Sequence, residues 1–178
     1  MALTQGDIAF ISFNADEDGW STATTQFLTG TSDASTAIPV GGTFFLEADD
    51  ENQVLHLYDD SKSGLPVTGF DFTSSLGLNQ TDGSGVLREV DLEASTKVGN
   101  RIFWLGSQSN SDDGKNRPNR DRVFATDING TGAATTLSYV GRYDFLKEDI
   151  INWDVNNGHG KGANYYGLAG RFNRTYAK

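Results

Sequence analysis

The sequence predicts an all-β fold, mostly antiparallel, with one short helix near residues 144–156. Three observations lead to this class: short apolar runs that alternate with polar turns, an internal repeat of hairpins, and a composition rich in glycine and poor in proline. The chain contains 21 Gly and 3 Pro in 178 residues, which is typical of many tight turns. A chain of this length is expected to form one domain.

The internal repeat relates residues 42–72 to residues 88–145. Each copy holds two apolar runs joined by a polar connection, and each second run ends in aspartate. The paired runs are 43–48 with 54–59 in the first copy and 101–106 with 122–127 in the second. Both pairs are therefore predicted to be β-hairpins, the second with a long polar loop.

Each copy continues with a third predicted strand, 65–72 in the first and 135–145 in the second. Residues 86–93 alternate apolar with charged side chains, as a half-buried strand does. Four strands in a row, repeated, are the plan of a β-propeller blade. We therefore expect propeller-like blades that form an incomplete propeller, while a plain β-sandwich of the same strands stays open as the alternative.

The segments before the repeat differ in composition. Residues 8–13 form an apolar run that predicts a strand, whereas residues 21–37 are mostly Thr, Ser, Ala and Gly, which favours a loop or linker. We thus divide the chain into an N-terminal strand and polar linker, 1–37, and a blade-containing domain, 38–170.

After the repeat, Asp144 is placed to cap a helix in which Leu146, Ile150 and Trp153 share one face. Residues 171–178 are expected to form a basic tail.

The charge and the absence of cysteine exclude several classes of function. The formal charge is −10, and affinity for nucleic acid depends on clustered Lys and Arg, so nucleic-acid binding is not expected. Without cysteine the chain has no disulfide, thiolate metal site or cysteine nucleophile. No apolar run approaches the roughly 20 residues that cross a bilayer, so no membrane span is expected.

The turn of the first hairpin is a candidate metal site. Asp49, Asp50, Glu51 and Asn52 place oxygen-bearing side chains in one turn, and oxygen is the ligand that calcium prefers. Acidic hairpin turns without a bound ion are also common. Calcium is the cofactor that these residues favour.

Asp91 and Glu93 are the second candidate. They lie two residues apart on a predicted strand, which puts both carboxylates on one face. Two acids crowded together either bind a divalent cation or raise one pKa for acid–base work. The alternative is that these carboxylates lie on a solvent-exposed face and pair with Arg88 or Arg101.

The long loop of the second hairpin is a candidate ligand-binding loop, because long loops held by a rigid scaffold often carry binding groups. Arginines there could clamp a phosphate or a carboxylate, or could merely neutralise neighbouring aspartates. The candidate residues are Ser107, Asn110, Asp112, Arg117 and Arg120.

Four stretches together resemble the domain of unknown function 3616 family of bacterial, often cyanobacterial, proteins: 46–55, 89–94, 101–107 and 114–120. The resemblance spans roughly residues 38–168. It implies a β-propeller similar to that of phytase-like esterases and a relation to calcium-dependent phosphoesterases. The family's Asp–Leu–Glu motif matches Asp91 to Glu93 of this chain. Family members are longer, so this chain resembles a truncated copy.

Residues 3–16 separately resemble a module that opens some large secreted cyanobacterial proteins. This resemblance implies an extracellular or cell-surface location, with a cytoplasmic one left open.

Three hypotheses about function follow from the sequence. The first is a non-catalytic β module that binds calcium, a small molecule or a protein partner through its loops. The second is a metal-dependent phosphoesterase that uses Asp91, Glu93 and Arg117. The third is an inactive fragment of a longer domain.

Overall fold

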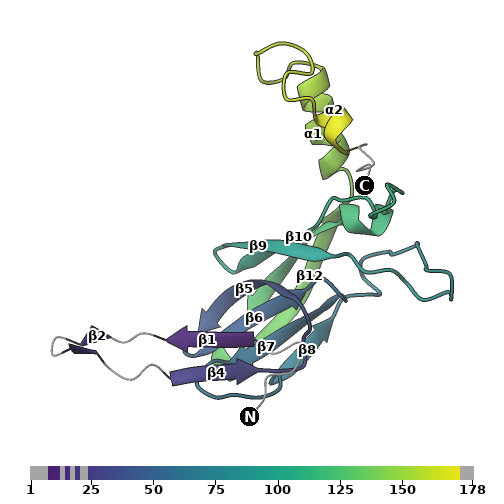
Figure 1. The fold of residues 1–178 in the computed structure, drawn as a ribbon. Helices are drawn as coiled ribbons and strands as arrows, with labels where there is room; N and C mark the ends of the chain where they lie inside the picture. Colours follow the sequence, from purple (N-terminus) through teal and green to yellow (C-terminus); the bar gives the residue numbers. More distant parts are fainter. Residues whose placement is uncertain (1–7, 13–14, 17–18, 21–23, 173–178) are drawn as a thin grey trace.

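The computed structural model of the chain describes residues 8–12, 15–16, 19–20 and 24–172. Its body consists of two four-stranded antiparallel sheets, with a β-hairpin beside one of them and a helical arm that projects from the other (Figure 1). The strands of each sheet follow one another along the chain, so both sheets are simple meanders. The structure confirms the predicted all-β, mostly antiparallel class.

The elements have the following bounds. The first sheet contains β5 (Ala34–Gly41), β6 (Phe44–Asp49), β7 (Val54–Asp59) and β8 (Thr68–Asp71). The second contains β9 (Leu92–Val98), β10 (Arg101–Gly106), β11 (Val123–Asn129) and β12 (Thr136–Tyr143). Outside these sheets lie β1 (Ile8–Ser12), β2 (Ala15–Asp16), β3 (Gly19–Trp20), β4 (Thr24–Leu28), η1 (Pro118–Asp121), η2 (Gly132–Ala134), α1 (Leu146–Val155) and α2 (Leu168–Phe172).

One hydrophobic core lies between the two sheets. Leu46 and Leu57, which are opposite each other in register, enter it from the first sheet. Trp104 and Phe124 enter it from the second, with ring centroids 6.4 Å apart. The indole N–H of Trp104 donates to Thr126 Oγ1 at 3.0 Å, so burial leaves this polar atom satisfied. The shared core joins the two meanders into one unit.

The first hairpin of each sheet has the same two-residue turn, which makes the faces of the two sheets comparable. Each turn begins with a glycine in the left-handed region, with φ of 63° at Gly42 and 61° at Gly99. One residue pair flanks this turn in each sheet. We call the sheet face on which that pair lies the front face, and the opposite face the back face. The flanking pairs are Gly41 with Phe44 and Val98 with Arg101.

The two sheets pack front to back. In the first sheet Phe44 and Leu46 reach the core from the front face. In the second sheet Ile102 and Trp104 reach it from the back face, whereas Phe103, on the front face, is 39% exposed. The front face of the second sheet is thus the counterpart of a surface that is buried in the first.

The first strands of the two sheets, β5 and β9, lie side by side and run in the same direction. Thr36 Oγ1 lies 2.6 Å from Ser95 Oγ, and further along both strands Lys97 Nζ donates to the carbonyl oxygen of Pro39 at 3.3 Å. Front-to-back packing about parallel first strands is the relation between neighbouring propeller blades. The described residues contain two such sheets and no closed ring.

The back face of the first sheet is covered by the β1–β4 hairpin. Leu28 of β4 packs in a small hydrophobic cluster with Phe45 and Tyr58. The Tyr58 hydroxyl donates to the carbonyl oxygen of Thr29 at 2.9 Å, which fixes the end of β4 on the sheet. The first sheet is therefore covered on both faces.

The helical arm, residues 146–172, is organised around one buried carboxylate. Asp154 is fully buried and accepts hydrogen bonds from His159 Nε2 at 3.1 Å and from the backbone N–H groups of Tyr166 at 2.8 Å and Leu168 at 3.0 Å. These bonds fold the glycine-rich connection back onto α1, where Trp153 and Tyr166 stack with centroids 5.8 Å apart. In the described part of the chain no helix has the length and apolar character needed to span a membrane.

Several expectations about element positions need correction. The predicted linker at 21–37 is wrong for its described part, because β4 and β5 fall within it or begin in it. Ile38 and Val40 of β5 are buried while intervening residues are exposed, so the strand uses one face only. The strand expected at 86–93 begins at Leu92 instead, since Asp91 adopts a left-handed φ of 62° that interrupts the extended chain.

The helix after the second sheet begins as expected, but without the predicted cap. Phe145 occupies the N-cap position, and no side chain caps α1. The Asp144 carboxylate instead pairs with Arg142 at 3.1 Å and lies 3.5 Å from Arg122 Nε. Of the predicted basic tail, 171–172 belong to α2, and 173–178 lie outside the described residues.

Candidate metal site

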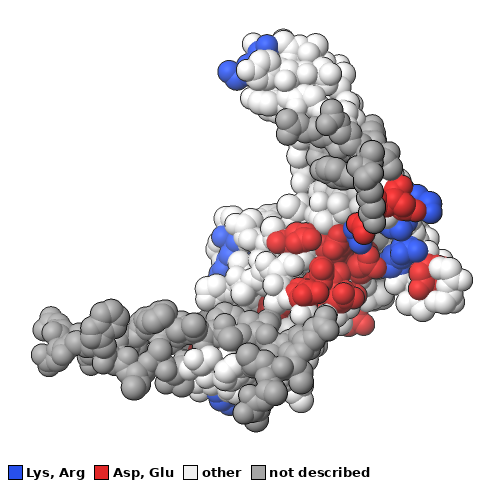
Figure 2. Space-filling view, viewed as in Figure 1, with Lys and Arg blue, Asp and Glu red and all other residues white. Residues whose placement is uncertain are grey.

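Carboxylates from three segments gather at one end of the two sheets: the residues before β5, the turn after β6, and the segment that leads into β9. The parallel course of β5 and β9, with β6 antiparallel to β5, brings these ends together. Figure 2 shows them as a red surface in the middle of the body. We call this group the acidic cluster, and its members are Asp33, Asp49, Asp50, Glu51, Glu89, Asp91 and Glu93.

The centre of the acidic cluster is formed by Asp33, Asp50 and Glu51, each of which offers a carboxylate oxygen within 4.8 Å of the others. Burial and the neighbouring charge of Asp33 raise the pKa of Asp50, and the charge of Asp50 in turn raises the pKa of Glu51. Asp50 Oδ1 is buried and has no hydrogen-bond partner among the described residues. Among the described residues, no lysine or arginine forms an ion pair with these three carboxylates.

Asp49 has a supporting position in the acidic cluster. It is 1% exposed and accepts hydrogen bonds from the Thr31 hydroxyl at 2.9 Å and from the backbone N–H groups of Glu51 and Asn52, both at 3.2 Å. These bonds close the turn after β6 and hold Asp50 at its tip. Asp49 therefore orders the turn, and its neighbours present the free oxygens.

Arg120 connects the long loop of the second sheet to the acidic cluster. Its guanidinium lies 2.9 Å from a Glu89 oxygen and 3.0 Å from an Asp91 oxygen. Burial acts to raise the pKa of Glu89, but the hydrogen bond and charge of Arg120 outweigh it and lower that pKa. Arg120 thus neutralises one side of the acidic cluster.

Glu93 lies between the two sides of the acidic cluster. Burial, followed by the charges of Asp91 and Asp50, raises the pKa of its carboxyl group. The sequence predicts Asp91 and Glu93 on one face of a single strand, whereas Asp91 lies before β9 with a left-handed φ of 62°; the charges of Asp91 and Asp50 both act on Glu93.

The base of the long loop reaches the acidic cluster through a close backbone approach. A Cβ atom on Gly106 would lie 2.5 Å from the carbonyl oxygen of Arg120 and 2.9 Å from that of Val90, so the site requires glycine. The Ser107 N–H donates to the Asp91 carbonyl oxygen at 2.8 Å. This contact ties the loop to the segment that carries the carboxylates.

The predicted loop residues occupy different places. Ser107 lies at the loop base, where its hydroxyl is 2.8 Å from that of Ser109, and Arg120 donates to Ser109 Oγ at 3.0 Å. Asn110 is half-buried in the outgoing part of the loop and Asp112 is exposed nearer its tip. Arg117 is half-buried directly before η1. The contacts of Ser107 and Arg120 lead to the acidic cluster.

Sequence reasoning did not select Asp33 or Glu89. Asp33 falls in the predicted linker, and only the formation of β5, whose start it precedes, brings it to the acidic cluster. Glu89 was considered part of an alternating strand, whereas it pairs with Arg120. The charge of Glu89 beside Asp91 was the available sequence signal.

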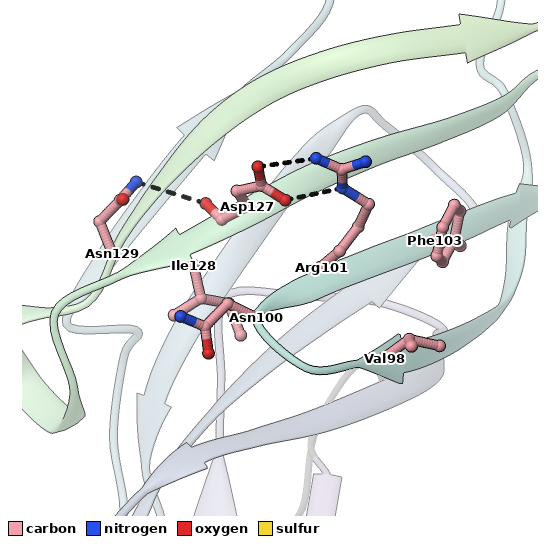
Figure 3. Close-up of a pocket in the computed structure, with 7 residues that line it drawn as sticks. All are labelled: Val98, Asn100, Arg101, Phe103, Asp127, Ile128 and Asn129. Carbon is pink, nitrogen blue, oxygen red and sulfur yellow. Dashed lines mark hydrogen bonds and ion pairs between the residues drawn. The ribbon is translucent and has the colours of Figure 1, made fainter.

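A hollow of about 540 Å³ lies elsewhere, on the second sheet (Figure 3). Val98 and Phe103 form part of its wall, and the Arg101 guanidinium makes two bonds, of 2.8 and 3.0 Å, to the Asp127 carboxylate. These two charges satisfy each other, and Asn100 and Asn129 also line the hollow, so its wall mixes polar and apolar groups.

Comparison with known proteins gives no information on the chemistry of this site. No family model, curated protein or solved structure matches the chain.

Proposed function

We propose that the chain is a non-catalytic β module that binds calcium at the acidic cluster. The observation that carries the proposal is the triangle of Asp33, Asp50 and Glu51, with oxygens within 4.8 Å of one another and Asp50 Oδ1 unpaired in the described part of the chain. A divalent cation there would offset the burial and the charge of Asp33 that raise the pKa of Asp50, and the charge of Asp50 that raises the pKa of Glu51. An extracellular or cell-surface location is part of the proposal and rests on the resemblance of residues 3–16.

The ligand types favour calcium over a transition metal. The acidic cluster offers carboxylate oxygens, which suit hard cations, and the chain has no cysteine. Calcium accepts six to eight oxygens in flexible geometry, whereas magnesium requires near-ideal octahedral ligation. Glu93, whose pKa is raised by burial and by the charges of Asp91 and Asp50, is proposed as a further ligand from the second sheet.

Calcium-dependent thermal stability tests this proposal. A ligand that binds only the folded state at 100 times its Kd stabilises it by about 2.7 kcal/mol, which corresponds to a rise in Tm of roughly 5–11 °C for a chain of this size. We expect this rise with calcium, a smaller one with magnesium, and reversal by chelator. Unchanged melting at millimolar calcium would contradict the proposal.

Two variants with the same charge change locate the effect. Asp50→Asn is expected to remove most of the calcium-dependent rise in Tm. Asp60→Asn, at an exposed position outside the acidic cluster, is expected to retain it. An equal loss in both variants would mean that calcium acts through net charge and not at the proposed site.

The phosphoesterase hypothesis makes a different prediction from the same residues. It requires chelator-sensitive hydrolysis of a generic phosphoester that is lost in Glu93→Ala. Arg120 already pairs with Glu89 and Asp91, so a phosphate would have to compete with these carboxylates for its guanidinium. Such hydrolysis, measured beside the calcium melts, would replace the non-catalytic proposal by this one.

A further inference from the structure

The hollow on the second sheet lies away from the acidic cluster. Its residues flank the turn between β9 and β10 and the end of β11, whereas Asp91 lies beyond the opposite end of β9. With about 540 Å³ it has the size of a small-molecule site, for which roughly 300–1,000 Å³ is typical. The hollow is therefore a candidate binding site in its own right.

One side of the hollow is apolar. Phe103 on β10 and Val98 on β9 both lie on the front face, with exposed fractions of 39% and 67%. The row of Phe103 continues with the small residues Ala125 on β11 and Gly141 on β12. A Cβ atom at Gly141 would meet nothing within 4 Å, so the row carries no large side chain beyond Phe103 in this direction. The ring can therefore present an apolar surface to a ligand.

The other side of the hollow is polar. The two asparagines of its lining, Asn100 and Asn129, lie across the central ion pair from the apolar side (Figure 3). Asn129 Nδ2 donates to Ser138 Oγ at 2.9 Å, which orients this amide. Each asparagine side chain carries both donors and an acceptor without a net charge. A ligand that fills the hollow must therefore have both an apolar and a hydrogen-bonding part.

The ion pair between the two sides decides the charge of the ligand. Arg101 and Asp127 are opposite each other in register, and two hydrogen bonds join the guanidinium to the carboxylate. An anion would have to displace Asp127, and a cation would have to displace Arg101. The pairing uses two of the five guanidinium donors and leaves each carboxylate oxygen a further lone pair. The pair therefore favours a neutral ligand whose groups both donate and accept.

Hydroxyl groups on neighbouring carbon atoms meet this requirement, because each hydroxyl donates one hydrogen bond and accepts others. A sugar ring carries such hydroxyls at its edge, and its C–H groups form an apolar face that suits the electron-rich face of an aromatic ring. A wholly apolar ligand would instead bury the ion pair and the amides without new hydrogen bonds, at a cost in free energy.

We propose that the hollow binds a neutral saccharide. Its C–H face lies against the ring of Phe103, and neighbouring hydroxyls bond to the Arg101–Asp127 pair and to the asparagine side chains. The residues of this site are separate from the acidic cluster, so binding does not require calcium.

Affinity electrophoresis of the full chain tests the proposal with defined probes. Each native gel contains one neutral polysaccharide, namely β-glucan, xylan, galactomannan or dextran, and a further gel contains the acidic polymer polygalacturonate. At least one neutral polymer is expected to retard the chain, to the same extent in calcium and in chelator. Migration that no neutral polymer changes would overturn the proposal. Retardation by polygalacturonate alone, or retardation that chelator abolishes, would do the same.

Variants with matched controls locate the binding. Phe103→Ala is expected to raise the Kd for the retarding polysaccharide at least about tenfold, because it removes the ring contact. Phe145→Ala, at a 61% exposed position that does not line the hollow, is expected to leave the Kd unchanged. Unchanged binding by Phe103→Ala, or an equal loss in both variants, would overturn the proposal.

Removal of the ion pair gives an independent test of the polar side. The double variant Arg101→Ala with Asp127→Ala keeps the net charge, so its mobility in a gel without polysaccharide serves as a direct reference. This variant is expected to lose the retardation, while circular dichroism shows the same β spectrum as wild type. A folded double variant that is retarded as strongly as wild type would contradict the assignment of the saccharide to the hollow.

Discussion

The two sheets share one plan and differ in what surrounds them. Both are four-stranded meanders that begin with the same glycine turn. The first is covered on both faces, whereas the second has an open front face, and buried acids such as Glu47 and Asp121 occur in both halves of the chain. The comparison shows that a common backbone leaves faces and turns free to specialise. The candidate site lies where the acids at the end of the first sheet approach the segment before β9, in which Asp91 pairs with Arg120.

The largest expected effect tests whether both sheets depend on the shared core. Trp104→Ala is expected to cost about 3–5 kcal/mol of unfolding free energy, because it opens a cavity and leaves Thr126 Oγ1 without its donor. Leu57→Ala in the first sheet is expected to cost about 2–5 kcal/mol. Urea denaturation followed by tryptophan fluorescence and by circular dichroism should show one transition in each variant. Separate transitions would mean that the sheets unfold independently.

Two buried carboxylates, Asp121 beside Lys147 and Glu47 beside His56, provide the next comparison. Burial raises the pKa of Asp121 although Lys147 opposes the rise, so this carboxylate depends on its partner. Lys147→Ala is expected to cost about 3 kcal/mol by leaving Asp121 buried and unpaired. His56→Ala in the first sheet should cost less, because the Thr31 hydroxyl lies 3.1 Å from Glu47 and can turn its one proton from Asp49 to Glu47. Denaturant midpoints measure both, and a larger loss from His56→Ala would contradict this ranking.

Glycine positions in the second sheet allow a smaller, sharper test. Gly106→Ala is expected to destabilise the fold by about 1–3 kcal/mol, since the new Cβ would overlap two backbone carbonyls. Gly141→Ala, in β12, meets nothing within 4 Å and is expected to be neutral. Thermal melts compare the two. Equal stability of both variants would show that the loop base can move away from β9.

The smallest expected effect concerns the charge of Asp50. Its folded-state pKa lies above the ordinary value of 3.8, so between the two values the folded state binds more protons than the unfolded chain. Ionisation of Asp50 therefore costs stability as the pH rises through the folded-state pKa. Without calcium, Asp50→Asn is expected to raise the Tm at pH 7 by on the order of 2 °C and to lose this advantage at pH 3.

The comparison of Asp50→Asn with wild type at each pH cancels the titration of other groups. The exposed change Asp60→Asn controls for net charge. An Asp50→Asn protein that melts below wild type at pH 7 would show that the Asp50 carboxylate stabilises the folded state and that its charge is not repelled by its neighbours.

The sequence predicts the hairpins correctly because the alternation of apolar and polar residues within each strand is a local pattern. The β6–β7 and β10–β11 pairs lie where the repeat predicted them. The first strand of the first sheet was missed, since β5 buries only Ile38 and Val40 and otherwise consists of small polar residues that resemble a linker. Its strand character comes from pairing with β6, which is information that a local pattern does not contain.

The candidate site was predictable only in part, for the same reason. Asp49 and Asp50 were recognised as one turn, and Asp91 with Glu93 as one pair, but their meeting depends on β5 and β9 lying side by side. Asp33 could not be selected without β5. The sequence predicts that Arg117 and Arg120 act together, whereas Arg117 directly precedes the 3₁₀ turn and Arg120, within that turn, pairs with Asp91.

Front-to-back packing also gives the molecule a direction, with consequences for how such a chain can change by duplication. A further meander introduced after Tyr143 would find the open front face of β9–β12 ready to receive its back face. One introduced before β5 would first have to displace Leu28 and the hairpin to which it belongs. Growth of this architecture is therefore favoured at one end and opposed at the other.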